Sequence, residues 1–137
     1  MPFVDTNILL YAVCPGDRDR AKSDVARQVL RRDDLHFSVQ VFQEFYVQAT
    51  RPTRHQPISH KEASSLIQHW LRFPVQENTV RLFQSALAAK ARFQISYWDA
   101  AILEAARAMG CREVLSEDLN AGQDYDGVVV VNPFATS

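Results

Sequence analysis

Four carboxylate side chains, Asp5, Glu44, Asp99 and Asp118, lie in otherwise apolar segments, each at a predicted strand end or early in a predicted helix. Like charges that meet in a cleft repel one another, and burial raises the free energy of each charged form. A hard divalent cation bound by carboxylate oxygens is the usual compensation. The acids therefore predict a metal site, and hydrolysis of phosphodiester bonds is the chemistry expected of it.

The first two acids also have simpler explanations. Asp5 is a good N-cap for a following helix, although a capping carboxylate keeps one oxygen free for another ligand. Glu44 shares a predicted helix face with Gln40, Gln43 and Gln48, which could be a solvated face. A solvated face usually mixes both signs of charge, whereas this one carries amides and a single carboxylate, which suits the wall of a cleft.

The other two acids are equally ambiguous when taken singly. Asp99 fits a capping box with Ser96 at the start of a largely apolar, and therefore buried, helix. Asp118 follows Ser116 and Glu117 in a sequence typical of turns, and the Ser-x-Asp spacing favours Asp118 over Glu117 as the fixed carboxylate. The set is more informative than its members, because parallel α/β sheets gather their sites at the carboxyl ends of the strands.

The elements that must position these acids follow from strand–helix alternation. Strands are predicted at residues 2–5, 35–38, 74–75, 112–116 and 128–131, the last with four consecutive valines, as expected for a strand buried on both faces. Helices are predicted at residues 6–13, broken by Pro15 and Gly16, and at 17–32, 39–51, 59–73, 78–94 and 96–109. Ser59 with Glu62 forms a capping box, and Asn78 is the predicted cap of the next helix. This order predicts an α/β fold with a mostly parallel sheet covered on both sides.

Composition narrows the classes of protein. A chain of 137 residues is expected to form one domain, residues 1–137, and it contains no apolar run near the ~20 residues that cross a bilayer. A net charge of −1 argues against binding nucleic acid through bulk charge, so such contact must use local basic patches. Cys14 and Cys111 are far apart in sequence, which indicates reduced thiols in a cytoplasmic protein rather than structural zinc.

One such basic patch is the stretch with Arg51, Arg54, His55, His60 and Lys61, which carries no acid before Glu62. Phosphate contact through Arg51, Arg54 and Lys61 is one interpretation, and an ordinary polar loop is the other. Five aromatic residues are predicted to lie in the core or an interface rather than to stack on bases: Tyr11, Phe42, Tyr46, Trp70 and Trp98.

The acidic segments resemble, in order, the motifs of the PIN domain. They are Val-Asp-Thr-Asn at residues 4–7, the isolated Glu44, Tyr-Trp-Asp-Ala-Ala-Ile at 97–102 and Leu-Ser-Glu-Asp-Leu-Asn at 115–120. The ending, Val-Asn-Pro-Phe at 131–134 after Gly122 and Gln123, is similar to that of VapC-type toxins within the family. The resemblance covers essentially the whole chain and is weakest at residues 51–58.

This resemblance implies a Rossmann-like, three-layer α/β/α sandwich with a central, mostly parallel sheet of about five strands. It also implies a ribonuclease that uses Mg²⁺, with Mn²⁺ as a substitute, and leaves 5′-phosphate and 3′-hydroxyl ends. VapC-type members are toxins that form homodimers and are held inactive by a small cognate antitoxin.

Carried over by residue, the resemblance makes Asp5 and Asp99 the principal metal ligands, with Asp118 and Glu44 completing the acidic pocket. Thr6, Asn7 and Ser116 match positions that support the acids through hydrogen bonds. Glu44 could align the attacking water, bind a second ion or accept a proton.

Three other functions stay open at this point. The chain could be a PIN-type nuclease that processes RNA or cuts structured DNA without a toxin role, or a binding module without catalysis. A phosphatase that places a nucleophilic Asp after its first strand needs a second Asp two positions later. Asn7 occupies that position here, which counts against a phosphatase.

Overall fold

The structure is a computed structural model that describes residues 1–14, 16 and 18–135. Its main sheet has the strand order β1-β4-β6-β5, formed by Pro2–Val4, Glu113–Leu115, Val128–Val131 and Asp124–Tyr125. A smaller parallel pair joins β2 (Phe37–Ser38) to β3 (Val75–Gln76), and a parallel bridge between Phe3 and His36 places this pair beside β1. All of the pairings are parallel except β5 with β6.

The predicted α/β class and mostly parallel sheet are confirmed, and each predicted strand has a counterpart. The short antiparallel strand β5 was not predicted. It reaches β6 through a tight turn in which Asp126 and Gly127 both have positive φ, and Asp124 Oδ1 accepts the Gly127 N–H at 2.6 Å. Two residues of strand are too short to show a period in the sequence, and the Asp126-Gly127 pair, a type favoured in hairpin turns, is the signal that could have located it.

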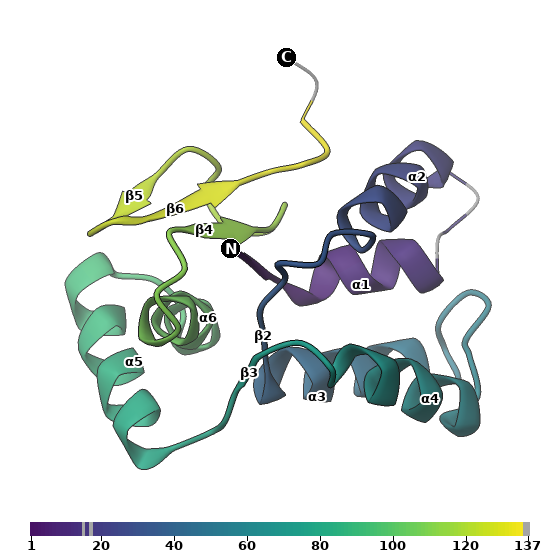
Figure 1. The fold of residues 1–137 in the computed structure, drawn as a ribbon, viewed down its shortest axis with the longest axis horizontal. Helices are drawn as coiled ribbons and strands as arrows, with labels where there is room; N and C mark the ends of the chain where they lie inside the picture. The colour runs from purple at the N-terminus through teal and green to yellow at the C-terminus, as the bar shows by residue number, and fades with distance from the viewer. Residues whose placement is uncertain (15, 17, 136–137) are drawn as a thin grey trace.

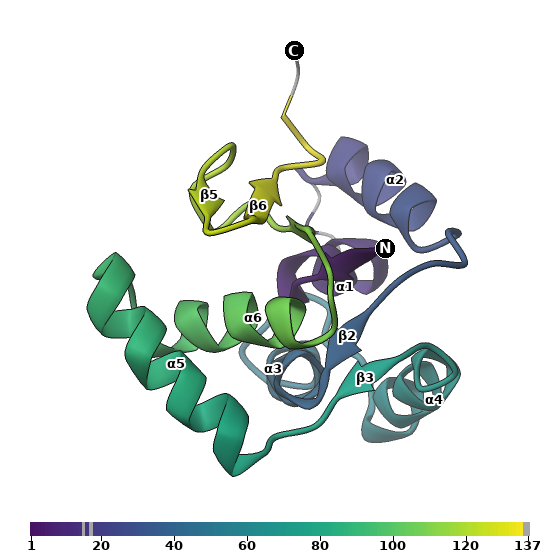
Figure 2. The same ribbon diagram turned by 60° about the vertical axis from the view of Figure 1, so that its left-hand side comes forward.

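The helices of the described residues lie in three pairs, visible in Figures 1 and 2. In chain order they are α1 (Thr6–Val13), α2 (Arg20–Val29), α3 (Val39–Ala49), α4 (His60–Trp70), α5 (Val80–Phe93) and α6 (Tyr97–Ala108). Helix α6 packs against β2, β4 and β6, with α5 on its outer side. Helices α1 and α2 pack together on the other side of the strands, and α3 contacts α1, α4 and β2 (Figure 2).

Helix ends differ from the predictions by a few residues. Helix α2 begins at Arg20 rather than at residue 17, and both Asp17 and the predicted break at Pro15 lie outside the described residues. The cap of α5 is Thr79, whose hydroxyl accepts the Leu82 N–H at 3.0 Å, so the prediction of Asn78 was wrong. The Asn78 side chain instead donates to Gln43. Asn and Thr both cap helices, so the sequence could not distinguish Asn78 from Thr79 as the cap.

The core places the strand ends in rigid surroundings. Phe3, Val4, Val114 and Leu115 are buried on the two central strands, and their parallel register pairs Val4 with Leu115. An aromatic group covers the β2 end of the sheet and contains Phe37, Phe42, Phe45, Trp70 and Phe73. The prediction that Phe42 and Trp70 lie in the core or an interface is therefore confirmed, because both are buried in the core.

None of the helices in the described part of the chain has both the length and the apolar character needed to span a membrane.

Helix α6 carries Asp99 in its first turn, and the Ser96 hydroxyl holds this turn by accepting the Asp99 N–H at 3.1 Å. We predict that Ser96→Ala lowers the free energy of unfolding by about 1 kcal/mol, because the first turn loses its cap. Ser96→Thr is the matched variant and should retain most of the stability. Urea denaturation measures both, and equal destabilisation by Ala and Thr would contradict this role for the hydroxyl.

Candidate active site

Asp5 stands where β1 gives way to α1 and is 7% exposed. Its backbone N–H continues the sheet by donating to the Leu115 carbonyl at 3.0 Å. Its Oδ1 accepts the Thr6 N–H at 2.8 Å, and its Oδ2 accepts the Ser116 hydroxyl at 2.8 Å. Oδ2 also accepts the Asn7 side-chain amide at 3.4 Å. The carboxylate is thus an N-cap whose orientation is fixed from α1 and from the end of β4, and Oδ1 retains a further lone pair for a ligand.

Asn7 and Ser116 connect the ends of β1 and β4. The Asn7 amide nitrogen donates to the Ser116 hydroxyl at 3.0 Å and to Asp118 Oδ2 at 3.1 Å. The Asn7 carbonyl oxygen accepts the Glu117 N–H at 3.3 Å, and the Ser116 hydroxyl accepts the Asp118 N–H at 3.1 Å. These neutral donors hold two carboxylates in place without cancelling their charge.

Glu44 reaches the same place from α3, whose first turn is capped by the buried Ser38. Its two oxygens accept hydrogen bonds from Thr6 Oγ1 at 3.0 Å and from Gln40 Nε2 at 2.7 Å. Gln40 lies four residues before Glu44, so the two side chains share one face of the helix. The amide face noted in the sequence therefore contacts the acidic cluster.

Two of these acids, Asp5 and Asp99, have pKa values above the usual value for aspartate. The pKa of Asp5 is raised to about 6, chiefly by burial and to a smaller extent by the charges of Glu44 and Asp118, while the hydrogen bonds from Ser116 and Thr6 oppose the rise. Burial also raises the pKa of Asp99, with Asp118 as the additional charge and Ser96 opposing. Each carboxylate is easier to ionise if a cation lies beside it.

The four acids line one cavity of about 110 Å³. Its other lining residues are Thr6, Asn7, Leu10, Gln48, Trp98 and Ile102, so none of the described residues that line it is a Lys, Arg or His. Uncompensated carboxylate oxygens are the donor set of Mg²⁺ and Mn²⁺. Within residues 1–14, 16 and 18–135, no three Asp, Glu, His or Cys side chains are gathered into a ready-made coordination shell.

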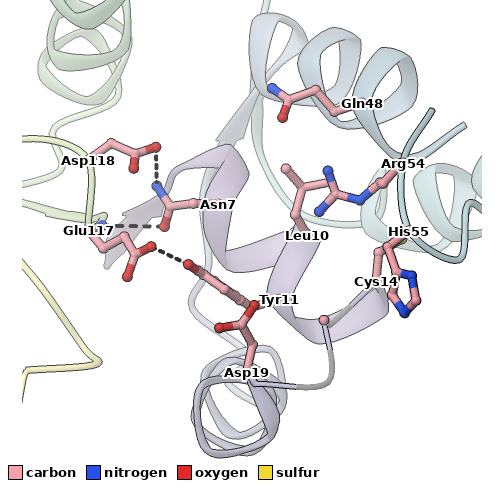
Figure 3. Close-up of a pocket in the computed structure, with 11 residues that line it drawn as sticks. Asn7, Leu10, Tyr11, Cys14, Asp19, Gln48, Arg54, His55, Glu117 and Asp118 are labelled. Atoms are coloured by element: carbon pink, nitrogen blue, oxygen red, sulfur yellow. Dashed lines mark hydrogen bonds between the residues drawn. The ribbon is translucent and has the colours of Figure 1, made fainter. Parts of the chain in front are cut away.

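Glu117 lies next to Asp118 in sequence but points elsewhere (Figure 3). Its carboxylate accepts the Tyr11 hydroxyl and pairs with the Lys22 ammonium at 2.9 Å. Phe134 packs on the Tyr11 ring at a centroid distance of 5.0 Å. The C-terminal segment and α2 thus fix Glu117 outside the acidic cavity and leave Asp118 to line it.

The residues of the predicted basic patch lie in different parts of the surface. A second cavity, of about 330 Å³, shares Asn7, Leu10, Gln48 and Asp118 with the acidic cavity and extends to Arg54 and His55. Figure 3 shows these two side chains across the pocket from Glu117 and Asp118. Arg51 lines a third pocket, described below, whereas Lys61 is exposed on α4 and lines none of these three.

Trp98 does not lie in the core of this chain, because the residue is 64% exposed, and its placement in an interface stays a prediction. Trp98 follows the Ser96 cap on the outer side of the first turn of α6, while Ala100 to Leu103 face inward. Trp98 is one of the residues that line the acidic cavity. The other positions of this helix are small or apolar, and such a pattern predicts burial all round without indicating which face a single large residue occupies.

Comparison with known proteins was made at the level of sequence family and of solved structure. The family model described as PIN domain matches residues 3–123. The VapC20 toxin of Mycobacterium tuberculosis, titled as cleaving the sarcin-ricin loop, has a TM-score of 0.67 at 21% identity, over 86% of this chain and 92% of that one. A toxin–antitoxin complex from Klebsiella pneumoniae gives a TM-score of 0.67 at 20% identity, over 97% and 98% of the two chains.

A third solved structure, VapBC2 of Rickettsia felis bound to a promoter DNA fragment, gives a TM-score of 0.64 at 12% identity, over 94% and 96%. At these identities the likeness establishes the fold alone. No curated protein sequence matches the chain significantly.

Because the pKa of Asp5 is raised, we predict that the difference in free energy of unfolding between the wild type and Asp5→Asn varies with pH in a metal-free buffer. The folded protein binds a proton at Asp5 with a pKa of about 6, against 3.8 for the unperturbed group. The contribution of this carboxyl to stability is therefore complete below pH ~4 and is lost as the pH rises through ~6.

Asp5→Asn should accordingly gain stability relative to the wild type between pH 4.5 and 8, by on the order of 1–3 kcal/mol. Urea denaturation with a chelator measures this difference. Added Mg²⁺ or Mn²⁺ should then raise the melting temperature of the wild type at pH 8 and leave that of Asp5→Asn unchanged. A stability difference that does not vary with pH would contradict the assignment of Asp5 as a strained carboxylate.

Proposed function

Because the chain belongs to the PIN-domain family, we propose that it is a divalent-metal-dependent endoribonuclease that acts as the toxin of a toxin–antitoxin pair. One observation carries this proposal: four carboxylates from β1, α3, α6 and the segment after β4 line one cavity without a cationic side chain among its described lining. A cluster of this kind at the carboxyl ends of parallel strands favours metal-assisted hydrolysis over recognition alone.

In this proposal Asp5 and Asp99 are the principal ligands of Mg²⁺ or Mn²⁺, and Asp118 and Glu44 complete the donor set. A bound divalent cation supplies charge neutralisation at the phosphate and lowers the pKa of a coordinated water. Glu44 lies with one oxygen on Thr6 and the other on Gln40, an arrangement that suits it to orient a water or accept its proton. Thr6, Asn7 and Ser116 are positioning residues, since they fix the carboxylates through hydrogen bonds.

The partners in the proposal are an RNA substrate, a second copy of the chain and a small cognate antitoxin, all in the cytoplasm. The supporting observations are the likeness to a toxin titled as cleaving the sarcin-ricin loop and to toxin–antitoxin complexes, over most of the length of each chain. Arg54 and His55, across the second cavity from Asp118, are placed where a negatively charged backbone leaving the acidic cavity would pass (Figure 3).

For catalysis, we predict that Asp5→Asn and Asp99→Asn each lower the rate of RNA cleavage in Mn²⁺ by at least ~100-fold, because each removes a ligand charge. Glu113→Gln is the matched control, since this exposed acid lies at the opposite end of β4. Gel analysis of total RNA, with mapping of the new ends, measures the rates. Near wild-type cleavage by either aspartate variant in folded protein would contradict the proposed site.

For the toxin role, we predict that expression of the wild-type chain slows growth of a bacterial host and that expression of Asp5→Asn does not. Where a short antitoxin-like reading frame precedes the gene, co-expression of its product should restore growth, because in this proposal an antitoxin blocks the acidic cavity or its approach. Growth curves at matched protein levels measure both effects. Normal growth with abundant, active wild-type nuclease would remove the toxin role and leave the nuclease intact.

A further inference from the structure

A third pocket, of about 510 Å³, opens beside the acidic cavity and shares Glu44, Gln48 and Trp98 with it. Its remaining lining residues are Gln40, Gln43, Val47 and Arg51, so it lies between α3 and the first turn of α6. Its volume is in the range of pockets that hold small ligands. An RNA strand with a phosphate at the four acids would place its adjoining nucleotide in this pocket.

Trp98 forms the aromatic wall of the pocket and is held there before any ligand arrives. Its backbone carbonyl accepts Gln40 Nε2 at 3.3 Å, and its ring meets the Tyr97 ring edge-on at a centroid distance of 5.0 Å. Tryptophan is among the most buried residue types on average, so a ring that is 64% exposed at the rim of a polar site is informative. A fixed, open indole presents a surface suited to stacking on another flat ring.

The opposite wall supplies polar groups of the kind that read base edges. Gln48 lines all three cavities, and its amide makes no side-chain hydrogen bond to any of the residues that the structure describes. An amide offers a donor pair and an acceptor, which match the edges of nucleobases. Arg51, at the outer end of the same wall, offers a guanidinium for phosphate.

We propose that this pocket binds one unpaired nucleobase next to the scissile phosphate, with the base stacked on Trp98 and its edge contacted by Gln48. The proposal rests on the proposed nuclease function, because it needs the phosphate at the acids. A nucleobase fits better than a protein segment, since the pocket joins the acidic cavity directly and combines one aromatic face with amide groups. A base must leave its helix to stack in this way, which places the contact in a loop or single strand.

The test measures the affinity of a short fluorescent RNA for the protein in Ca²⁺, which neutralises the acids, and gel analysis checks that the RNA stays intact. Trp98→Ala should weaken binding roughly 5- to 150-fold, the range expected for losing one stacked base, and Trp98→Phe should retain most of the affinity. Val80→Ala is the matched control, because Val80 is 73% exposed on α5 and lines none of the three cavities.

A second series removes one base at a time from the same RNA. Removal of the base at one position should weaken binding to the wild type by a similar factor. For Trp98→Ala, removal of the same base should leave the affinity unchanged. A residue with only a structural role would not produce this coupling. Quenching of Trp98 fluorescence, taken as wild type minus Trp98→Phe, should accompany binding, because the remaining Trp70 is buried.

The outcomes separate this inference from the function on which it rests. Trp98-dependent RNA binding without cleavage in Mn²⁺ would support the base pocket and remove the nuclease assignment. Cleavage and binding by Trp98→Ala at wild-type levels would overturn the base pocket and leave the nuclease. Loss of self-association in Trp98→Ala with unchanged RNA affinity would identify a protein interface and overturn the pocket, as would a wild type that binds none of the RNAs.

Discussion

Repulsion between carboxylates that share a small cavity is the constraint that organises this molecule. Four acids from distant parts of the sequence line about 110 Å³, and burial with neighbouring charges raises the pKa of Asp5 to about 6. Such an arrangement opposes folding unless something compensates the charge. Hydrogen bonds fix the positions of the carboxylates, and in the proposed function a cation compensates their charge. This division explains why the surrounding side chains are hydroxyls and amides rather than Lys or Arg.

The parallel register is what makes the arrangement rigid. Pairing Val4 with Leu115 brings Asp5 and Ser116, the next residue on each strand, side by side at the same edge of the sheet. Asn7 lies in the first turn of α1, from which its side chain contacts Ser116 and Asp118. The strands that supply these residues are buried and short, so a displacement of the site would require a shift of the core itself. The capped helices α3 and α6 bring Glu44 and Asp99 against this edge.

Much of this arrangement could be predicted from the sequence, because the relevant signals are local and strong. The apolar run that ends in Asp5 located the end of β1, and the capping signals at Ser59 and Ser96 located the starts of α4 and α6. The missing information was of a different kind. The exposure of Trp98 depends on which face of α6 meets the sheet, and the pocket beside it exists only once α3 and α6 are packed together. Neither property has a period or a motif, so tertiary contact alone determines it.

The sharpest measurement is a diffraction experiment on crystals grown with Mn²⁺, recorded at the manganese absorption edge. The account predicts an anomalous peak between the carboxylates of Asp5 and Asp99, with several ordered waters completing the coordination, and no such peak in crystals of Asp5→Asn. Well-ordered crystals with these carboxylates resolved and no manganese between them, or with manganese only elsewhere on the surface, would contradict it.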